Sequence, residues 1–458
     1  AVLQLGVTMD FAIFLYHSYQ AELKNTTDRN QAMSIAISKT FTSVLGSSLT
    51  TIAGFLALCS MNLTLGKDIG IVMAKGVLFG VISVVTILPS LILMFDKAIQ
   101  KTKHKELLPK FTTISEFNIK HYKAIIVIFL IALPIALYGY NNTKVYYKLD
   151  SSLPETLDSI SANNTLKDKF GLVSQEMILI NKDTPNDEIN EMLDKIEELD
   201  GVDFTLSYSK LSELGIPEEM LPEDLLSIFQ SDKYQMILIN SKYEIATDEL
   251  NNQIAKINEI VKQYDSNAKV VGEGPLMKDL VEISDHDFNS VNTVSIGIIF
   301  VIMMFVLKSI SLPVLLVIAI EFAIFINMGI PYYTNTTIPF IASIVIGTIQ
   351  LGATIDYAIL ITTKYIQNRK DGKDKKQAIS EALGTSINSI IVSGLCFFGA
   401  TFGVGAYSKI EMIGSLCTLM SRGAIISVIV VITVLPAFLM IFDRLVCKTT
   451  IGMREVKN

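Results

Sequence analysis

Nine long apolar segments dominate this sequence and limit what it can fold into. A helix that crosses a membrane needs about 20 mostly apolar residues. Segments near that length lie at 1–19, 35–61, 69–95, 124–140, 291–307, 312–330, 338–363, 378–406 and 412–442. Only 18% of the 458 residues are charged, against about a quarter in soluble domains. We therefore expect a polytopic α-helical protein, multi-pass in the cell (plasma) membrane.

The charged residues are segregated along the chain. The segment 144–289 is rich in Asp and Glu and has no Arg, whereas the basic residues gather in short loops at 24–29, 97–123 and 369–376 and in the tail after 444. Such basic loops are cytoplasmic under the positive-inside rule. Alternation of the spans then places the acidic segment outside the cytoplasm.

The acidic segment alternates between strand and helix patterns. Strands are expected at 176–181, 202–206, 235–240 and 269–272, and helices at 187–199 and 247–264. Two β-α-β units in series are typical of a ferredoxin-like fold. We expect one extracytoplasmic α+β domain of this porter type, with an insertion that carries Pro217 and Pro222.

These patterns divide the chain into six regions. The segment 98–121, which links the two repeats, is interpreted as an amphipathic helix on the inner membrane surface or, as an alternative, as a solvated connection. The regions are 1–97, the end of a first transmembrane repeat with three helices, the first cut short; 98–121, the cytoplasmic linker; 122–142, a transmembrane helix that opens a second repeat; 143–290, the α+β domain; 291–443, five transmembrane helices; and 444–458, a cytoplasmic tail.

One segment occurs twice. QLGVTMDFAIFLYHSY at 4–19 and QLGATIDYAILITTKY at 350–365 align with a constant offset of 346 positions, which pairs Asp10 with Asp356. A repeat on this scale indicates that the two halves were built on one plan.

Asp10 and Asp356 are the leading candidates for function. A carboxylate inside a span costs several kcal/mol unless it is neutralised or paired, and such acids mark ion or proton pathways. The alternative is a buried acid that only fixes helix packing. Gly6 and Gly352 lie four residues earlier on the same helix face, so we expect them to be helix-packing glycines that let a neighbouring helix approach.

The span that follows each acid carries hydroxyl groups at helical spacing. A polar stripe facing two acids can hold a file of water or coordinate a cation, although Ser and Thr in membrane helices also serve as close-packing residues. The stripe residues are Thr40, Ser43, Ser47 and Thr50 in the first copy and Ser386, Ser389 and Ser393 in the second.

The two copies differ beside their acids. Tyr357 follows Asp356, whereas Phe11 follows Asp10. A phenol can hydrogen-bond a carboxylate or relay a proton and a phenyl ring cannot, so we expect the second copy to be the more active proton site. Lys75 and Arg422 are expected to pair with acids or lipid headgroups, and Glu321 is a further acid within a span.

Sequence signatures of enzymes are missing. There is no Walker P-loop, HExxH, CxxC pair or GxSxG, and the 4 His residues are scattered. The 4 Cys residues lie in or beside apolar runs, so we expect packing roles and no disulfide framework. We expect no enzyme, no cofactor, no metal and no nucleic-acid partner.

Together, these motifs resemble the RND superfamily of exporters, and within it the MMPL (hydrophobe/amphiphile efflux) family. The similarity covers essentially the whole chain. It is carried by the paired GxxxD helices and their Ser-rich neighbours, LKSISLP at 307–313, IGSLCTLMSRG at 413–423 and GEGPLMKDLVEISDHDF at 272–288.

The resemblance implies a twelve-span protein of two six-span repeats, of which this chain would be a fragment holding the fourth to twelfth helices. It also implies a proton relay that maps onto Asp10, Asp356 and Tyr357. Phe11 stands where the family pattern has a Tyr after the Asp. This departure argues against a relay in which the two copies play the same part. The multidrug type of this superfamily has a basic residue on its tenth helix, whereas residues 353–360 contain no Lys. The single small extracytoplasmic domain argues further against that type and against an outer-membrane tunnel partner.

We therefore expect an exporter driven by the proton-motive force that moves hydrophobic or amphiphilic molecules such as lipids, fatty acids or drugs. Two alternatives remain open. One is a sterol- or lipid-sensing membrane protein without net transport, and the other is a sodium-driven pump of the same fold. The sequence also leaves homo-oligomerisation open.

Overall fold

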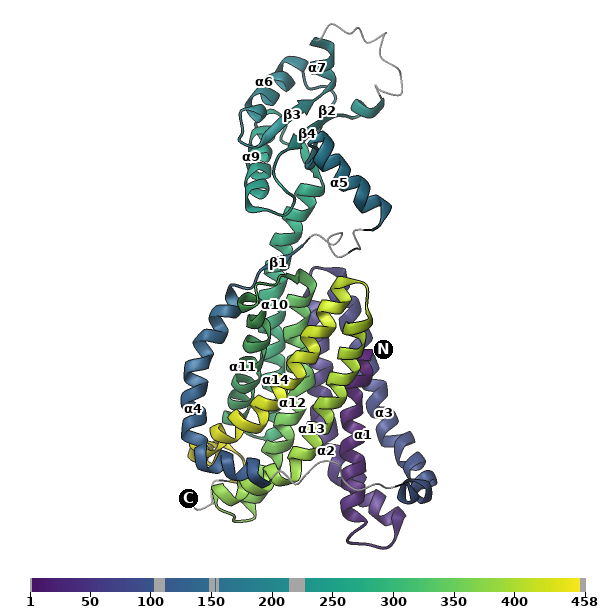
Figure 1. Cartoon of the computed structure of the whole chain (residues 1–458), viewed down its shortest axis with the longest axis vertical. Helices are drawn as coiled ribbons and strands as arrows, with labels where there is room; N and C mark the ends of the chain where they lie inside the picture. Colours follow the sequence, from purple (N-terminus) through teal and green to yellow (C-terminus); the bar gives the residue numbers. More distant parts are fainter. Residues whose placement is uncertain (1, 103–111, 148–152, 154–155, 214–226, 454–458) are drawn as a thin grey trace. The chain divides into compact units, whose positions relative to one another are not determined.

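A computed structural model describes residues 2–102, 112–147, 153, 156–213 and 227–453 of the chain. These residues form two compact units. Unit 1 comprises Ala1–Val145 with His286–Asn458, and unit 2 comprises Tyr146–Asp285. Figure 1 shows a helical bundle for unit 1 and a small sheet with helices for unit 2. The expected insertion at Pro217 and Pro222, and residues 103–111 of the 98–121 linker, lie outside the described residues.

Among the described residues, nine long helices build unit 1, and each corresponds to one predicted apolar segment. Shorter elements are η1 (Leu58–Ser60), α15 (Asp443–Thr449), β1 (Val145–Tyr146) and β6 (Ile338–Pro339). The long helices are α1 (Val2–Glu22), α2 (Arg29–Ala57), α3 (Thr64–Lys101), α4 (Thr112–Asn141), α10 (Glu273–Leu307), α11 (Ser311–Tyr333), α12 (Phe340–Lys370), α13 (Lys375–Tyr407) and α14 (Glu411–Ile441).

Seven of these helices, α3, α4 and α10 to α14, are long and apolar enough to cross a membrane. An eighth is added when the segments Arg29–Phe41 and Val44–Ser60 of α2 and η1, which meet at 43°, are taken as one broken span. The prediction of a multi-pass membrane protein is thereby confirmed. The described part of α1 does not pass this test, although it packs within the same bundle.

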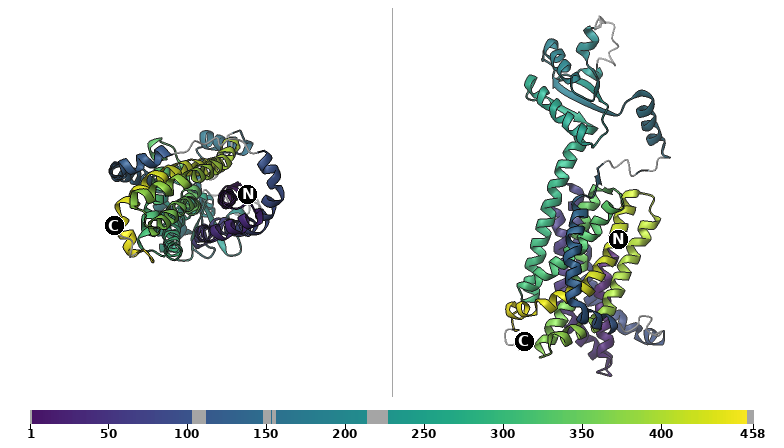
Figure 2. Two further views of the ribbon diagram at one scale, coloured as in Figure 1. Left: turned by 90° about the horizontal axis from the view of Figure 1, so that it is seen from below. Right: turned by 60° about the vertical axis from the view of Figure 1, so that its left-hand side comes forward.

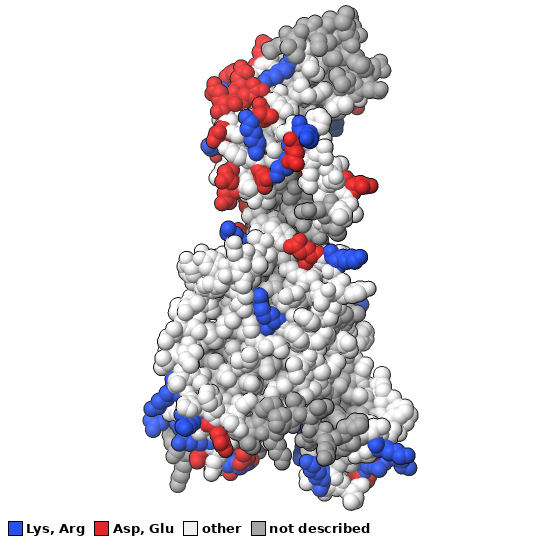
Figure 3. All heavy atoms as spheres, in the orientation of Figure 1, with Lys and Arg blue, Asp and Glu red and all other residues white. Residues whose placement is uncertain are grey.

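The helix that carries Asp356 is the centre of the bundle. Within its apolar stretch, 89% of the residues of α12 are buried, compared with 22% for α4 and 28% for α3. Helices α2, α11, α13 and α14 all pack against α12, as the view along the bundle in Figure 2 illustrates. The side walls of the bundle carry few charges on the face drawn in Figure 3, as expected for a surface in contact with lipid.

The bundle has two ends, named here by their turns. The 371–374 end holds the turn between α12 and α13, and the 408–410 end holds the turn between α13 and α14. At the latter end, Asp287 of α10 accepts hydrogen bonds from the backbone N–H groups of Asn62 (2.9 Å) and Leu63 (3.1 Å). Since Leu63 is the N-cap of α3, this carboxylate satisfies free N–H groups near the start of that helix.

Unit 2 has the ferredoxin-like α+β topology predicted from the sequence. Its antiparallel sheet has the order β3-β4-β2-β5. In chain order this is the arrangement of a split β-α-β fold. The unit contains α5 (Asp158–Phe170), β2 (Ser174–Asn181), α6 (Asn186–Glu197), β3 (Val202–Leu206), α7 (Tyr208–Glu213), β4 (Tyr234–Ser241), α9 (Asp248–Tyr264) and β5 (Lys269–Gly272).

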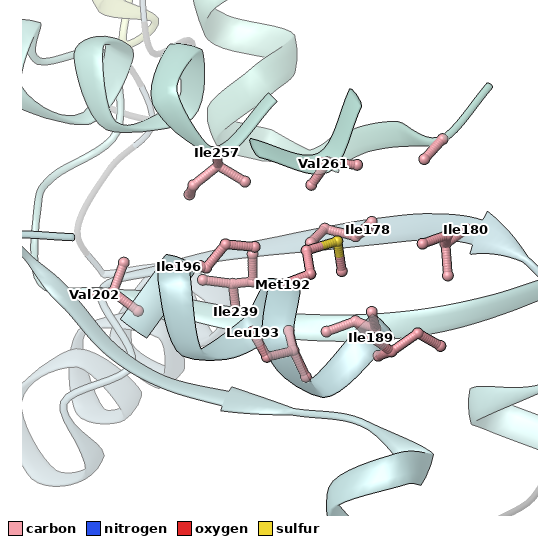
Figure 4. Packing of buried hydrophobic residues seen from close by; sticks show 12 residues of the cluster. Ile178, Ile180, Ile189, Met192, Leu193, Ile196, Val202, Ile239, Ile257 and Val261 are labelled. Carbon is pink, nitrogen blue, oxygen red and sulfur yellow. The ribbon is translucent and has the colours of Figure 1, made fainter. Parts of the chain in front are cut away.

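Alternation of apolar and polar residues builds the core of unit 2. On β2, Ile178 and Ile180 are buried while the residues between them are less so, because successive strand residues point to opposite faces. They meet the apolar faces of α6 and α9, where Leu193 and Ile257 are buried. Figure 4 shows these side chains packed together. Unit 2 therefore has its own hydrophobic core.

Unit 2 spans Tyr146–Asp285, inside the predicted 143–290 domain, and two helices beside it begin earlier than predicted. Helix α4 already begins at Thr112, ten residues before the span predicted at 122–142. Helix α10 begins at Glu273 within unit 2 and ends at Leu307 within unit 1. The chain therefore passes from one unit to the other through an unbroken helix.

A buried acid in unit 2 makes its stability depend on pH. Glu176 on β2 is 0% exposed, and only one of its carboxylate oxygens is bonded, to Ser174 Oγ at 2.6 Å. Burial raises the pKa of Glu176 above its ordinary value, and the Ser174 hydrogen bond offsets part of that rise. Folding therefore favours the protonated form. Its stabilising contribution is present at acidic pH and is lost as the pH rises through the raised pKa.

We predict that Glu176→Gln stabilises unit 2 at neutral and alkaline pH, because the amide cannot ionise. The gain should shrink as the pH falls below the raised pKa. Urea unfolding at a series of pH values, monitored by hydrogen exchange of the backbone amides of residues 174–181, measures this difference in stability. Glu259→Gln, at an exposed position on α9, is the control. A Glu176→Gln effect that does not change with pH would contradict the prediction.

Candidate functional site

Asp10 and Asp356 lie together in the interior of the bundle. Asp10 is near the middle of α1 and Asp356 near the middle of α12, and each side chain is 2% exposed. The two carboxyl groups are close enough to interact electrostatically. Like charges in a low-dielectric interior repel strongly, so the pair is most stable when at least one acid is neutral.

Asp10 is held by groups from the other half of the chain. Ser393 Oγ on α13 donates a hydrogen bond to Asp10 Oδ1 at 2.6 Å, and the hydroxyl of Tyr357 on α12 lies beside the same carboxylate. Tyr357 directly follows Asp356 in sequence, yet it serves Asp10. A helix turns by about 100° per residue, so adjacent side chains face different neighbours.

Asp356 faces the first half but is held less tightly. The hydroxyl of Ser47 on α2 lies beside the Asp356 carboxyl, close enough to interact with it. However, neither carboxylate oxygen of Asp356 nor Ser47 Oγ has a partner that meets hydrogen-bond geometry among the described residues. The two groups are therefore adjacent without a closed hydrogen bond. Asp356 is therefore a buried acid without a hydrogen bond to its carboxylate.

The two acid–hydroxyl contacts are related by the sequence offset. Ser47 and Ser393 are 346 positions apart, as are Asp10 and Asp356. Each acid therefore faces the serine that lies at the matching position of the other half. Of the predicted polar stripe, these two serines are the residues that the structure brings to the acids.

Among the described residues, the other stripe hydroxyls make no hydrogen bond to either acid. Thr40 donates to Ala36 O (2.8 Å) and Thr50 to Ser47 O (2.6 Å), both within α2. Ser386 and Ser389 are buried on α13. The side chain of Ser43 lies outside the described residues.

Gly6 lies where α1 packs against α13, and Gly352 lies where α12 packs against α2. A Cβ atom at Gly6 would be 2.7 Å from the ring of Phe397 on α13, which leaves no room for a side chain. At Gly352, Thr51 of α2 donates a hydrogen bond to the glycine carbonyl at 2.9 Å, and an added Cβ would be 3.7 Å from Thr51. The approach is therefore tighter at Gly6 than at Gly352.

Two charged clusters near the 371–374 end were missed from the sequence. Asp443 accepts hydrogen bonds from Arg369 Nε (3.1 Å) and Nη2 (3.0 Å) and from the Tyr365 hydroxyl. Asp96 accepts from Tyr19 (3.3 Å) and pairs with Arg29 (3.0 Å). The signal was available in the matching segments LPSLILMFDK and LPAFLMIFDR, which carry these two acids.

The remaining charged candidates behave differently from one another. Arg422 donates from Nε to Asn327 Oδ1 at 2.9 Å and from Nη2 to Asn327 O at 2.7 Å. Asn327 in turn donates to Gln350 Oε1 at 2.8 Å, which links α11, α12 and α14. Lys75 is exposed on α3. Glu321 is half-buried on α11, within electrostatic reach of Tyr140.

Comparison with known proteins identifies relatives of this chain. The model of the MMPL family matches residues 1–114 and 191–454. The chain is 23% identical over 448 residues to the putative membrane protein ActII-3 of Streptomyces coelicolor, covering 95% of this chain and 60% of that protein. The chain therefore spans well under two thirds of this relative.

Two further relatives are named as exporters. The mycolic acid-containing lipids exporter MmpL11 of Mycolicibacterium smegmatis is 23% identical over 185 residues, covering 39% of this chain and 19% of that protein. The siderophore exporter MmpL5 of Mycobacterium tuberculosis is 22% identical over 179 residues, covering 38% of this chain and 18% of that protein.

The hydrogen bond between Ser393 and Asp10 gives a stability prediction. Ser393→Ala should destabilise the bundle by about 1–3 kcal/mol, because it removes a hydrogen bond to a buried acid. The thermal unfolding midpoint of the purified protein measures the loss. Thr401→Val is the matched control, since this buried hydroxyl on the same helix donates to Phe397 O and Phe398 O of its own helix backbone. Equal losses in both variants would contradict the role given to Ser393.

Proposed function

Because this chain belongs to the MMPL family, we propose that it exports hydrophobic or amphiphilic molecules, such as lipids, from the cell membrane in exchange for protons. Asp10, Asp356 and Tyr357 form the proton relay in this proposal. The relatives named as exporters of lipids and siderophores support the export of such molecules. The chain spans only part of those proteins, so the activity is proposed for the protein to which this chain contributes.

The observation that carries the proposal is the buried acid pair with exchanged hydroxyl partners. Asp10 of one half meets Ser393 of the other, and Asp356 faces Ser47. A buried carboxylate that loses or gains a proton changes both its charge and its hydrogen bonds. Since these contacts, one of them the Ser393–Asp10 hydrogen bond, join helices of different halves, we propose that protonation shifts one half against the other, as in transporters built from repeats.

The two acids differ in how well their anionic forms are stabilised. The hydroxyl of Ser393 bonds Asp10 and Tyr357 lies beside it, whereas neither oxygen of Asp356 is bonded. An anion without donors in an apolar interior is the costlier one. We therefore propose that Asp356 takes up the proton first, while Asp10 holds its charge longer.

Helix α10 offers a route from the relay to the substrate. It is one helix from Glu273 to Leu307, and its Asp287 binds the turn before α3. A shift of the bundle helices therefore acts on the helix that continues into unit 2. We propose that unit 2 lies outside the cytoplasm and takes part in moving the substrate.

We predict that Asp356→Asn abolishes export driven by a pH gradient while the protein still folds, because the amide cannot take up and release a proton. Efflux of a fluorescent amphiphile from proteoliposomes with an imposed pH gradient measures this. Ser408→Ala, in the turn before α14, serves as the control and should export normally.

Three outcomes separate the alternatives. Export that persists in Asp356→Asn would contradict the relay. Flux that follows a sodium gradient and ignores pH would favour the sodium-driven pump. Saturable lipid binding without flux would favour the lipid sensor, which the GxxxD helices alone also fit.

A further inference from the structure

Several buried hydroxyl groups near the acid pair have no hydrogen-bond partner among the described residues. They belong to Thr348 and Thr362 on α12 and to Ser386 on α13, in addition to Ser47 and the carboxylate of Asp356. Thr348 is 1% exposed, and Thr362 and Ser386 are 0% exposed. Other buried side chains of the bundle that lack a partner for a polar atom are Ser115, Asn118 and Asn388.

The three hydroxyls extend from the acids toward both ends of the bundle. At about 1.5 Å rise per residue, Thr348 lies roughly 12 Å from the level of Asp356 toward the 408–410 end. Thr362 lies roughly 9 Å from it toward the 371–374 end. Ser386 is two helical turns from Ser393 on the same face of α13, also toward the 371–374 end.

The first half has no such row. The position that matches Thr362 is Tyr16, whose hydroxyl accepts a hydrogen bond from Gln20 at 2.7 Å. The position that matches Ser386 is Thr40, which donates to Ala36 O. The position that matches Thr348 is Val2, which has no hydroxyl. At these three matching pairs the unpaired hydroxyls lie in the second half, while in the first half Ser47 Oγ is also without a partner among the described residues.

A buried hydroxyl without a partner costs about 1–3 kcal/mol, so such groups are ordinarily satisfied by water. A hydroxyl both donates and accepts, which is what a chain of hydrogen bonds needs to pass a proton. Each transfer forms one O–H bond as the next one breaks, so that one proton moves and no electrons are exchanged.

We propose that Thr348, Thr362 and Ser386 line the hydrated path along α12 and α13 by which protons reach and leave the acid pair. This inference rests on the proposed proton relay and adds the route that serves it. Thr348 lines the part toward the 408–410 end, and Thr362 and Ser386 line the part toward the 371–374 end. These residues position water and do not themselves hold the transported proton.

The test measures proton uptake into proteoliposomes of phosphatidylethanolamine and phosphatidylglycerol that contain the intact protein and a pH-sensitive dye. Thr362→Val keeps the shape of the side chain and removes its hydroxyl. We expect proton uptake to fall about tenfold, a factor that corresponds to one lost hydrogen bond of about 1.4 kcal/mol. Thr362→Ser restores the hydroxyl and should restore uptake. Ser386→Ala, a smaller change on the neighbouring helix, should also lower it.

Thr354→Val is the matched control. Thr354 is also buried on α12, but its hydroxyl donates to Gln350 O of its own helix at 2.8 Å, so the variant should take up protons at the wild-type rate. Binding of a fluorescent amphiphile should stay unchanged in every variant.

Wild-type uptake by both Thr362→Val and Ser386→Ala would overturn the path, as would equal losses in Thr362→Val and Thr362→Ser, which indicate a packing role. These failures are distinct from failure of the relay itself. If Asp356→Asn blocks proton uptake while the hydroxyl variants do not, the relay stands and only the path is wrong. If Asp356→Asn takes up protons normally, the relay is wrong.

Discussion

The structure depends on two carboxyl groups held inside an apolar bundle, each against a serine of the other half. Such groups are costly in a membrane interior unless they are neutralised or hydrogen-bonded. Asp10 is bonded by Ser393, and Asp356 is left with Ser47 beside it and no closed bond. The halves are thus joined at their centre by contacts whose strength depends on a proton.

The sequence was sufficient for the architecture because hydrophobic length and strand alternation are local signals. The nine apolar segments, the succession of strands and helices in unit 2 and the bounds of β3 and β5 all follow from patterns within one segment. The offset of 346 also selected Ser47 and Ser393 as members of a stripe. The contact of each serine with the acid of the other half could not be predicted from the sequence, because it depends on which helices pack together.

The same reason explains what sequence reasoning missed. Tyr357 was considered beside its neighbour Asp356, but the helix turns its phenol toward Asp10. Asp443 lies in a segment that the sequence analysis did not single out, and it is bound by Arg369 and Tyr365 of another helix. Hydroxyl stripes likewise look uniform in sequence, whereas Thr40 is satisfied by its own backbone and Ser386 is not.

The central claim is that Asp356 changes its protonation state in the folded protein. Infrared difference spectroscopy of the purified protein during a pH change measures this, through the C=O stretch of a protonated carboxylic acid. The account predicts a band in the wild type that disappears as the pH rises and is missing from the spectrum of Asp356→Asn. An identical carboxylic acid band in Asp356→Asn would contradict the account.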